Sequence, residues 1–252
     1  MKHLDQPFSL VEWNEKCLPF NFKGYGDHGA SIWFVGLEFR GSGVQSEMDG
    51  YQHGERVYLL SSEQILREHR NGTRIYDYMA YVMARLRDPA NDSIDKYIGN
   101  NLLQPGDGSF FTNAYMLPRP SFDADLTPHM REIGFTSIEQ YKKTVEIYRF
   151  DMLRKLWKAQ KRAFAICFGT SAWPAYRKLL NLEHMQPEKI TVQKTAAEVQ
   201  FYEESGVFLT PFFGRWGRGR GFLPFSVVQA VADRMRKNWP KRAEGTDSMS
   251  PL

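Results

Sequence analysis

The sequence is poor in cysteine, with only Cys17 and Cys167 among 252 residues. Two thiols cannot build a disulfide framework or a cluster site that needs four thiolates. Cys167 lies within the apolar run AFAICFG, where a thiol packs as a small hydrophobic side chain. The scarcity of cysteine is typical of a protein from a reducing compartment, and we expect the cytoplasm.

Long apolar runs are also absent. No stretch approaches the ~20 apolar residues that a membrane helix needs, and the start of the chain, MKHLDQPFSLVEW, lacks the basic-then-apolar pattern of a secretion signal. The sequence contains no internal repeat, and its six histidines do not cluster at the spacing of metal ligands. We therefore expect a monomeric globular protein without a membrane partner, a metal or a cofactor.

The sequence does have the material for a large core, since 42% of its residues are hydrophobic and 14% are aromatic. Short apolar runs at 31–35, 110–112, 164–168 and 207–209 predict buried strands. Helical patterns begin at Ser62 and cover 75–86, 137–161, 171–180 and 225–238. This alternation predicts an α/β fold, a single three-layer α/β/α domain with a mainly parallel four-stranded central sheet. We assign residues 1–239 to the domain and residues 240–252 to a disordered polar tail.

Each predicted strand ends in a polar or glycine-containing loop. Ligands of open α/β sheets bind at the carboxyl ends of the strands, so the four loops should converge on one site. Glu38 follows the first strand, where a carboxylate can activate water, although it could instead cap the turn or pair with Arg40. Asn113 ends the second strand and can bind the edge of a nucleobase, with a simple Asx turn as the alternative.

The third loop contains Gly169, Thr170 and Ser171, whose backbone N–H groups could bind a phosphate at a helix N-terminus. In the competing interpretation, Ser171 is a plain N-cap.

The fourth loop begins at Thr210, within the stretch FLTPFFGRWGRGRGFLPF that runs from Phe208 to Phe225. It combines three kinds of residue. Arginines contact phosphates regardless of base sequence, aromatic rings stack on bases, and glycines allow close backbone approach. This combination favours a nucleic-acid contact over a solvated basic loop, and its arginine and aromatic members are Phe212, Phe213, Arg215, Trp216, Arg218, Arg220 and Phe222. A second basic run is interpreted as a solvated helix face: Arg149, Arg154, Lys155, Lys158, Lys161 and Arg162.

In this order, the loops resemble those of the uracil-DNA glycosylase superfamily. The first loop is similar to the G-x-[D/E/N]-P-type loop of that superfamily; here it consists of Gly36, Leu37, Glu38, Phe39, Arg40 and Gly41. FFTNAYMLPRP resembles its strand that ends in a base-reading asparagine, and ICFGTSA its small-residue turn. LTPFFGRWGRGRGFLPFS resembles the H-P-S-type loop that precedes the closing helix.

The resemblance implies a base-flipping enzyme that hydrolyses an N-glycosidic bond. Glu38 would position water and stabilise the cationic sugar, Asn113 would bond the flipped base, and Thr210 would take the third catalytic position. The base pocket would be lined by Gly36, Leu37, Phe39, Arg40, Gly41 and Asn113. The DNA would be held by Gly169, Thr170, Ser171, Arg215, Trp216, Arg218 and Arg220.

The chain departs from the family pattern at several positions. Thr210 stands where the family has a histidine, Phe39 replaces a proline, and the four cysteines of the iron–sulfur branch are missing. Arg40 stands where a ring in the uracil-specific branch excludes bases substituted at C5. These departures favour a modified pyrimidine over uracil, such as a hypermodified cytosine of phage DNA, and so an anti-phage DNA glycosylase.

Other functions remain open on the sequence alone. Thr210 is also compatible with a non-catalytic nucleic-acid-binding module on the same fold, and a classical uracil-removing repair enzyme is a further alternative. A small-molecule or nucleotide hydrolase could use the same loops. A metal-dependent nuclease is disfavoured, because Asp123 and Asp125 belong to no D…E-x-K pattern. In the insertion after the first strand, Asp49, Tyr51 and His53 could line a pocket or a surface loop.

Overall fold

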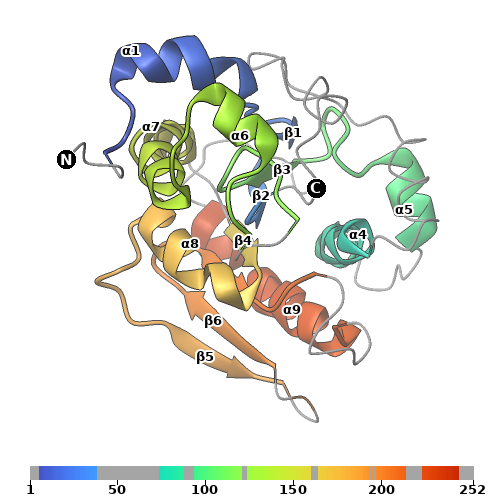
Figure 1. Ribbon diagram of the computed structural model, residues 1–252. Helices are drawn as coiled ribbons and strands as arrows, with labels where there is room; N and C mark the ends of the chain where they lie inside the picture. The colour runs from blue at the N-terminus through green and yellow to red at the C-terminus, as the bar shows by residue number, and fades with distance from the viewer. Residues whose placement is uncertain are drawn as a thin grey trace.

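The computed structural model of the chain, drawn in Figure 1, describes residues 6–38, 74–87, 94–120, 124–159, 164–192, 195, 197–213 and 223–243. The helix predicted at Ser62 lies outside these ranges, as does the insertion that contains Asp49, Tyr51 and His53.

A mixed seven-stranded sheet forms the centre of the molecule, in the order β1-β3-β2-β4-β7-β6-β5. The four predicted strands are its middle: β3 (Ser109–Asn113), β2 (Ile32–Gly36), β4 (Phe164–Phe168) and β7 (Val207–Thr210). Each pairs in parallel with its neighbour. The α/β class is therefore confirmed. The count of four strands is wrong, because antiparallel strands extend the sheet on both sides.

The three additional strands lack a buried apolar run for a sequence pattern to detect. β1 (Tyr25–Gly26) has two residues, and β5 (Glu188–Thr191) is an edge strand whose charged residues are exposed. β6 (Glu198–Tyr202) lies between β5 and β7 and carries the polar Gln200 in its centre. Short or charged strands are usual at sheet edges, where they block pairing with other chains.

Helices cover both faces of the sheet (Figure 1). Alternate side chains of β2 point to opposite faces, so Trp33 and Val35 join one core cluster and Ile32 and Phe34 the other. The first cluster lies under α7 (Ile138–Ala159) and α8 (Trp173–Leu180). The second lies under α4 (Ile75–Arg87), α5 (Ile94–Asn100) and α9 (Phe225–Ala243). The described elements thus stack as helix, sheet and helix.

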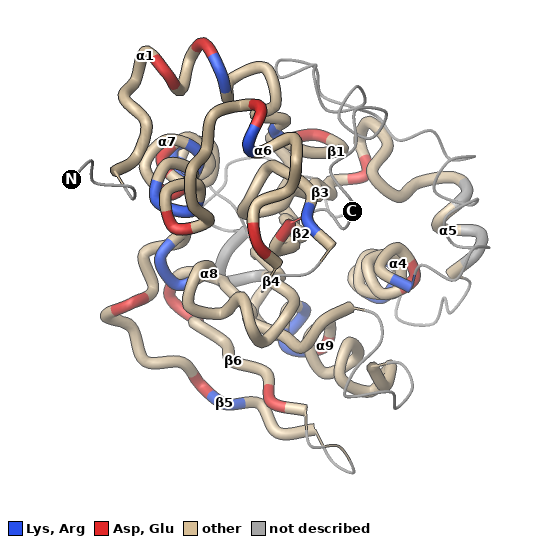
Figure 2. Tube along the Cα trace, in the orientation of Figure 1, with Lys and Arg blue, Asp and Glu red and all other residues tan. Residues whose placement is uncertain are grey.

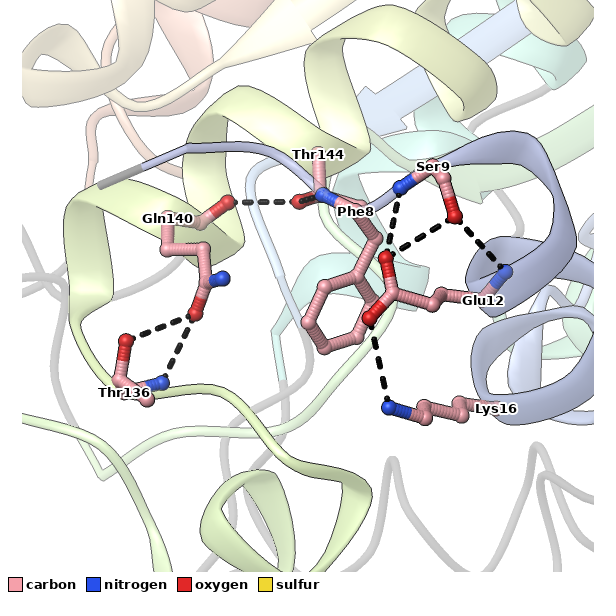
Figure 3. A network of polar contacts seen from close by, with 7 residues as sticks. All are labelled: Phe8, Ser9, Glu12, Lys16, Thr136, Gln140 and Thr144. Carbon is pink, nitrogen blue, oxygen red and sulfur yellow. Dashed lines mark hydrogen bonds and ion pairs between the residues drawn. The ribbon is translucent and has the colours of Figure 1, made fainter. Parts of the chain in front are cut away.

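The N-terminal segment packs on α7 as a short helical clasp (Figure 3). It comprises α1 (Leu10–Glu12), a π-helical turn (Trp13–Cys17) and a 3₁₀ turn (Leu18–Phe20). Ser9 and Glu12 form a capping box that starts α1. The Phe8 N–H donates to Thr144 Oγ1 of α7 at 3.0 Å, and the Phe8 ring stacks on Phe135, with ring centroids 4.4 Å apart. The clasp closes one end of the first core cluster.

Most predicted helices are found within a few residues of their expected limits. The closing helix is an exception, because α9 continues beyond the predicted end at Asn238, through Pro240, to Ala243. A proline removes one backbone hydrogen bond from a helix, but here the helix extends past it. The predicted tail is therefore wrong for residues 240–243, while residues 244–252 lie outside the described part. Across the described ranges, no helix is both long and apolar enough to cross a membrane.

Candidate functional site

The carboxyl ends of the four parallel strands lie at one edge of the sheet. Gly36 pairs with Asn113 across β2 and β3, and Phe168 pairs with Thr210 across β4 and β7. β2 and β4 are direct neighbours, with Val35 opposite Cys167. The four strand ends, after which the four predicted loops begin, therefore lie side by side.

Backbone and side-chain donors satisfy the carbonyl groups at this edge. The Phe168 carbonyl accepts from Tyr176 Oη at 2.9 Å, and the Thr210 carbonyl accepts from Trp173 Nε1 at 3.1 Å. The Gly36 carbonyl accepts from Ala114 N at 2.9 Å, so the β2–β3 pairing continues past the strand ends. Because buried carbonyls without partners are costly, these bonds hold the four ends in a defined geometry.

Gly36 and Asn113 fit together closely. A Cβ atom built on Gly36 would lie 2.1 Å from Asn113 Oδ1 and 3.4 Å from Phe168 Cε2. Any larger residue at position 36 would therefore displace the amide of Asn113. Glycine is needed here because of this close approach and not for a positive φ. The buried Asn113 amide thus lies over the backbone of the neighbouring strand.

Glu38 forms a buried ion pair with Arg119. Arg119 Nε donates to Glu38 Oε2 at 2.8 Å, with side-chain exposures of 0% for the arginine and 6% for the glutamate. Arg119 Nη1 also donates to the Ala124 carbonyl at 3.1 Å, which ties the pair to the segment leading to α6 (Pro128–Ile133). The partner considered from the sequence, Arg40, lies outside the described residues. The carboxylate is therefore held beside the strand end that carries Asn113.

The environment of Glu38 shifts its acidity. Burial raises the pKa of Glu38 to about 7, and the effect of burial exceeds the opposite effects of Arg119 and Lys142. Carboxylates with a pKa near the working pH are suited to exchange protons with a substrate or a water molecule. Perturbed acids of this kind are concentrated at functional sites.

Thr210 is fully buried at the end of β7. Its hydroxyl donates to the Pro211 carbonyl at 3.0 Å and lies 3.5 Å from the Cys167 carbonyl. The observed contacts therefore give it a role in holding the strand end. Its catalytic role stays a prediction.

The third loop differs from a simple capped helix. Gly169 has a φ of 118°, which favours glycine, and its N–H donates to the Thr210 carbonyl at 3.0 Å. Thr170 and Ser171 are exposed in a 3₁₀ turn (Thr170–Ala172), and the N-cap of α8 is Ala172, with no side-chain cap. The N-cap interpretation of Ser171 is therefore wrong, because the 3₁₀ turn shifts the helix start. The phosphate contact predicted for this loop stays a prediction.

The two ends of the arginine-rich loop are anchored on Tyr78 of α4. Tyr78 Oη donates to the Leu223 carbonyl at 2.6 Å, and its ring lies 5.5 Å from that of Phe213. Phe213 is buried and stacks on Phe168 at 4.9 Å, whereas Phe212 is 43% exposed. Phe213 and Leu223, the described residues on either side of the arginine-rich segment, therefore both contact Tyr78.

Several predicted site residues lie outside the described ranges: Phe39, Arg40, Gly41, Arg215, Trp216, Arg218 and Arg220. The described part of the site consists of Gly36, Leu37, Glu38, Asn113, Gly169, Thr170, Ser171 and Thr210. Of these, Gly36 and Asn113 lie on the paired ends of β2 and β3, and Glu38 follows β2 by two residues.

Two buried arginines near the site were not identified as site residues from the sequence. Arg119 lies between two prolines in an otherwise apolar run, which is an unusual place for a solvated charge. Arg149 was assigned to a solvated helix face, and this is wrong: it is 1% exposed. It falls four residues after Val145 and four before Leu153, on the buried stripe of α7, so helical spacing could have identified it. Figure 2 shows charges of both signs along α7.

The described residues contain no group of three or more His, Cys, Asp or Glu side chains placed to hold a metal ion. Asp125 is exposed and pairs with Arg131, while Asp123 lies outside the described ranges. A hollow of about 500 Å³ lies beside β5 and β6, lined by His184, Met185, Gln186, Glu188, Phe201, Glu203 and Glu204. Phe201 and Tyr202 pair with the first half of β7, so this hollow lies away from the strand-end site.

No protein-family model matches the chain, and no curated protein matches it.

Proposed function

We propose that the protein is a DNA glycosylase that flips a modified base, a pyrimidine such as a hypermodified cytosine, out of the helix and hydrolyses its N-glycosidic bond. The observation that carries the proposal is that Asn113 ends β3 while Glu38 follows the end of the adjacent strand β2. Gly36 pairs with Asn113, and Glu38 follows two residues later, buried against Arg119. A carboxylate beside an amide that can bind a base edge is the minimal set for this reaction.

In the proposed reaction, Glu38 accepts a proton from a water molecule whose oxygen attacks C1′ of the flipped nucleotide. The bond between C1′ and the base nitrogen breaks, and its electron pair leaves with the base. The ionised carboxylate also stabilises the positive charge that develops on the sugar. Arg119 holds the carboxylate in one orientation at 2.8 Å. The Asn113 amide holds the base during bond cleavage.

The predicted DNA contacts complete the proposal. Phe212 is exposed beside the strand ends, and Arg215, Arg218 and Arg220 follow it in the sequence. Unstacking a base costs a few kcal/mol, which phosphate contacts and an inserted side chain can offset. The anchors of this loop on Tyr78 support such a role, because a loop held at both ends can press on DNA.

The test is an alkali-cleavage assay on duplex and single-stranded DNAs that carry uracil, deaminated purines, hypermodified cytosines or no modification. Cleavage of a modified DNA is expected, with less on uracil DNA. Glu38→Gln should lower the rate by about 10²- to 10⁴-fold, the usual contribution of a general base, while DNA affinity is unchanged. The matched control Glu132→Gln alters an exposed carboxylate on α6 and should keep full activity. A protein that makes no abasic sites on any substrate would refute the proposal.

The second candidate function is a non-catalytic nucleic-acid-binding module. Thr210 favours it, because its hydroxyl is buried and donates to the carbonyl of the next residue, Pro211. This candidate predicts salt-sensitive DNA binding with no cleavage of any substrate. The same set of DNAs therefore distinguishes the two functions.

A further inference from the structure

Arg149 is a charged residue in the interior of the fold. It lies on the buried side of α7 and is 1% exposed. Its guanidinium donates to the Asn113 carbonyl through Nε at 3.1 Å and Nη2 at 2.8 Å, and Nε also lies 3.1 Å from the Ala114 carbonyl. The side chain thus holds the backbone of the residue that ends β3.

The other half of the guanidinium binds the N-terminal region. Nη1 donates to Asn21 Oδ1 at 2.6 Å and to the Phe22 carbonyl at 2.8 Å, and Nη2 donates to Thr112 Oγ1 at 3.3 Å. One planar group therefore joins α7, the end of β3 and the segment before β1. Arginine is suited to this because it presents five N–H donors in a rigid fork.

The acceptors in these hydrogen bonds are all neutral carbonyl, amide or hydroxyl oxygens. Burial lowers the pKa of Arg149 to about 10, so the group is still charged at neutral pH. Moving a charge from water into the protein interior costs several kcal/mol. Hydrogen bonds to neutral partners recover only part of that cost. An apolar residue at this position would avoid the cost but could not bind the three segments. The buried arginine therefore fixes the positions of the three segments at a cost in the free energy of folding.

We propose that Arg149 is a positioning residue that sets the orientation of the Asn113 amide by clamping its backbone carbonyl. The amide lies over Gly36 with little space, so a small shift of the β3 end moves it away from a bound base. The bound base rests on the proposed function, whereas the clamping of the carbonyl concerns the protein alone. A misplacement of about 1 Å at a reacting group can cost ~100-fold in rate.

The test uses Arg149→Lys, which keeps the charge but loses the fork, and Arg149→Met, which loses both. Arg177→Lys is the matched control, because Arg177 also donates to neutral side chains, Tyr202 and Gln200 of β6, which lies several strands away from β3. The first measurement is amide hydrogen exchange at Ala114 and Tyr115, whose N–H groups bond to the carbonyls of Gly36 and Leu37. Arg149→Lys should speed exchange there at least tenfold and leave the amides of β4 unchanged.

The second measurement is single-turnover cleavage of the best substrate from the alkali assay. Both Arg149 variants should lose about 100-fold in kcat with KM within threefold of wild type and an unchanged pH profile, whereas Arg177→Lys should keep full activity. The proposal would be overturned if Arg149→Lys kept the exchange rates and the kcat of the wild type, because charge alone would then suffice. If the wild-type protein cleaves no substrate, the proposed function fails, and the exchange at Ala114 and Tyr115 still decides the role of Arg149. Arg149→Lys also decides it if Arg149→Met does not fold.

Discussion

The burial of Glu38 links the acidity of this carboxyl group to the stability of the protein. Burial raises the pKa of Glu38 from its ordinary value of 4.5 to about 7. The folded protein therefore holds this proton to a higher pH than the unfolded chain does. The corresponding contribution to stability is fully present below pH 4.5 and is lost as the pH rises through about 7.

This linkage predicts a pH-dependent difference between the wild type and Glu38→Gln. The free energy of unfolding of the wild type, minus that of the variant, should fall by about 3 kcal/mol between pH 5 and pH 8. Urea unfolding at several pH values measures both quantities, and the variant acts as the control for all other titrating groups. A difference that stays constant over this range would show that Glu38 titrates normally.

At the scale of elements, the clasp on α7 depends on one buried hydroxyl. Thr144 Oγ1 accepts from the Phe8 N–H at 3.0 Å and donates to the Gln140 carbonyl at 2.8 Å (Figure 3). Tyr148 of the same helix donates to the Phe8 carbonyl at 3.0 Å and stacks on Trp13. Thr144 is fully buried, so water cannot replace its hydroxyl.

Thr144→Val should therefore destabilise the protein by about 1–3 kcal/mol, because the Phe8 N–H loses its acceptor in a buried place. Protease cleavage within residues 8–20 should also become faster. Urea unfolding and limited proteolysis measure the two effects. Thr136→Val is the matched control: its hydroxyl bonds Gln140 Oε1 at an exposed position, and the change should stay within about 0.5 kcal/mol. Equal urea midpoints for the two variants would contradict this account of the clasp.

The elements that the sequence predicted well have a strong local signal. The four parallel strands are runs such as IWFVG and FAICF that are buried on both faces, and such strands have continuous apolar sequences. The edge strand β5 has no such run, because most of its residues are exposed and two are charged, although it pairs with β6, the next strand along the chain. β1 has only two residues and pairs with β3, far along the chain, so no local pattern reveals it.

For the site, the sequence placed Glu38 and Asn113 correctly on strand ends but missed what holds them. Among the described residues, Glu38 pairs with Arg119, which lies far along the chain. Arg149 was grouped with Arg154 and Lys155 by sequence proximity, although helical geometry turns it to the opposite side. Charge counts along a sequence do not distinguish a buried guanidinium from a solvated one.

For the whole molecule, the DNA-binding proposal makes a prediction about salt. Arg218→Ala with Arg220→Ala should reduce the slope of log affinity against log salt by about 2, one for each lost phosphate contact. Fluorescence anisotropy with labelled DNA at several salt concentrations measures this slope. The matched control removes the same charge from Lys155 and Lys158, which are exposed near the end of α7. Equal slopes for the two double variants would remove the arginine-rich loop from the DNA interface.

The stage of synthesis at which the site forms is determined by the parallel pairing of β2, β3, β4 and β7. β2 pairs with β3 and β4, and β4 pairs with β7. Each of these partners is synthesised only after a long stretch of chain. Such distant pairings make folding slow. A nascent chain that ends before β7 leaves one side of β4 without a partner, and an unpaired strand invites aggregation. This edge of the sheet is therefore completed late, only after residues 207–210 have left the ribosome.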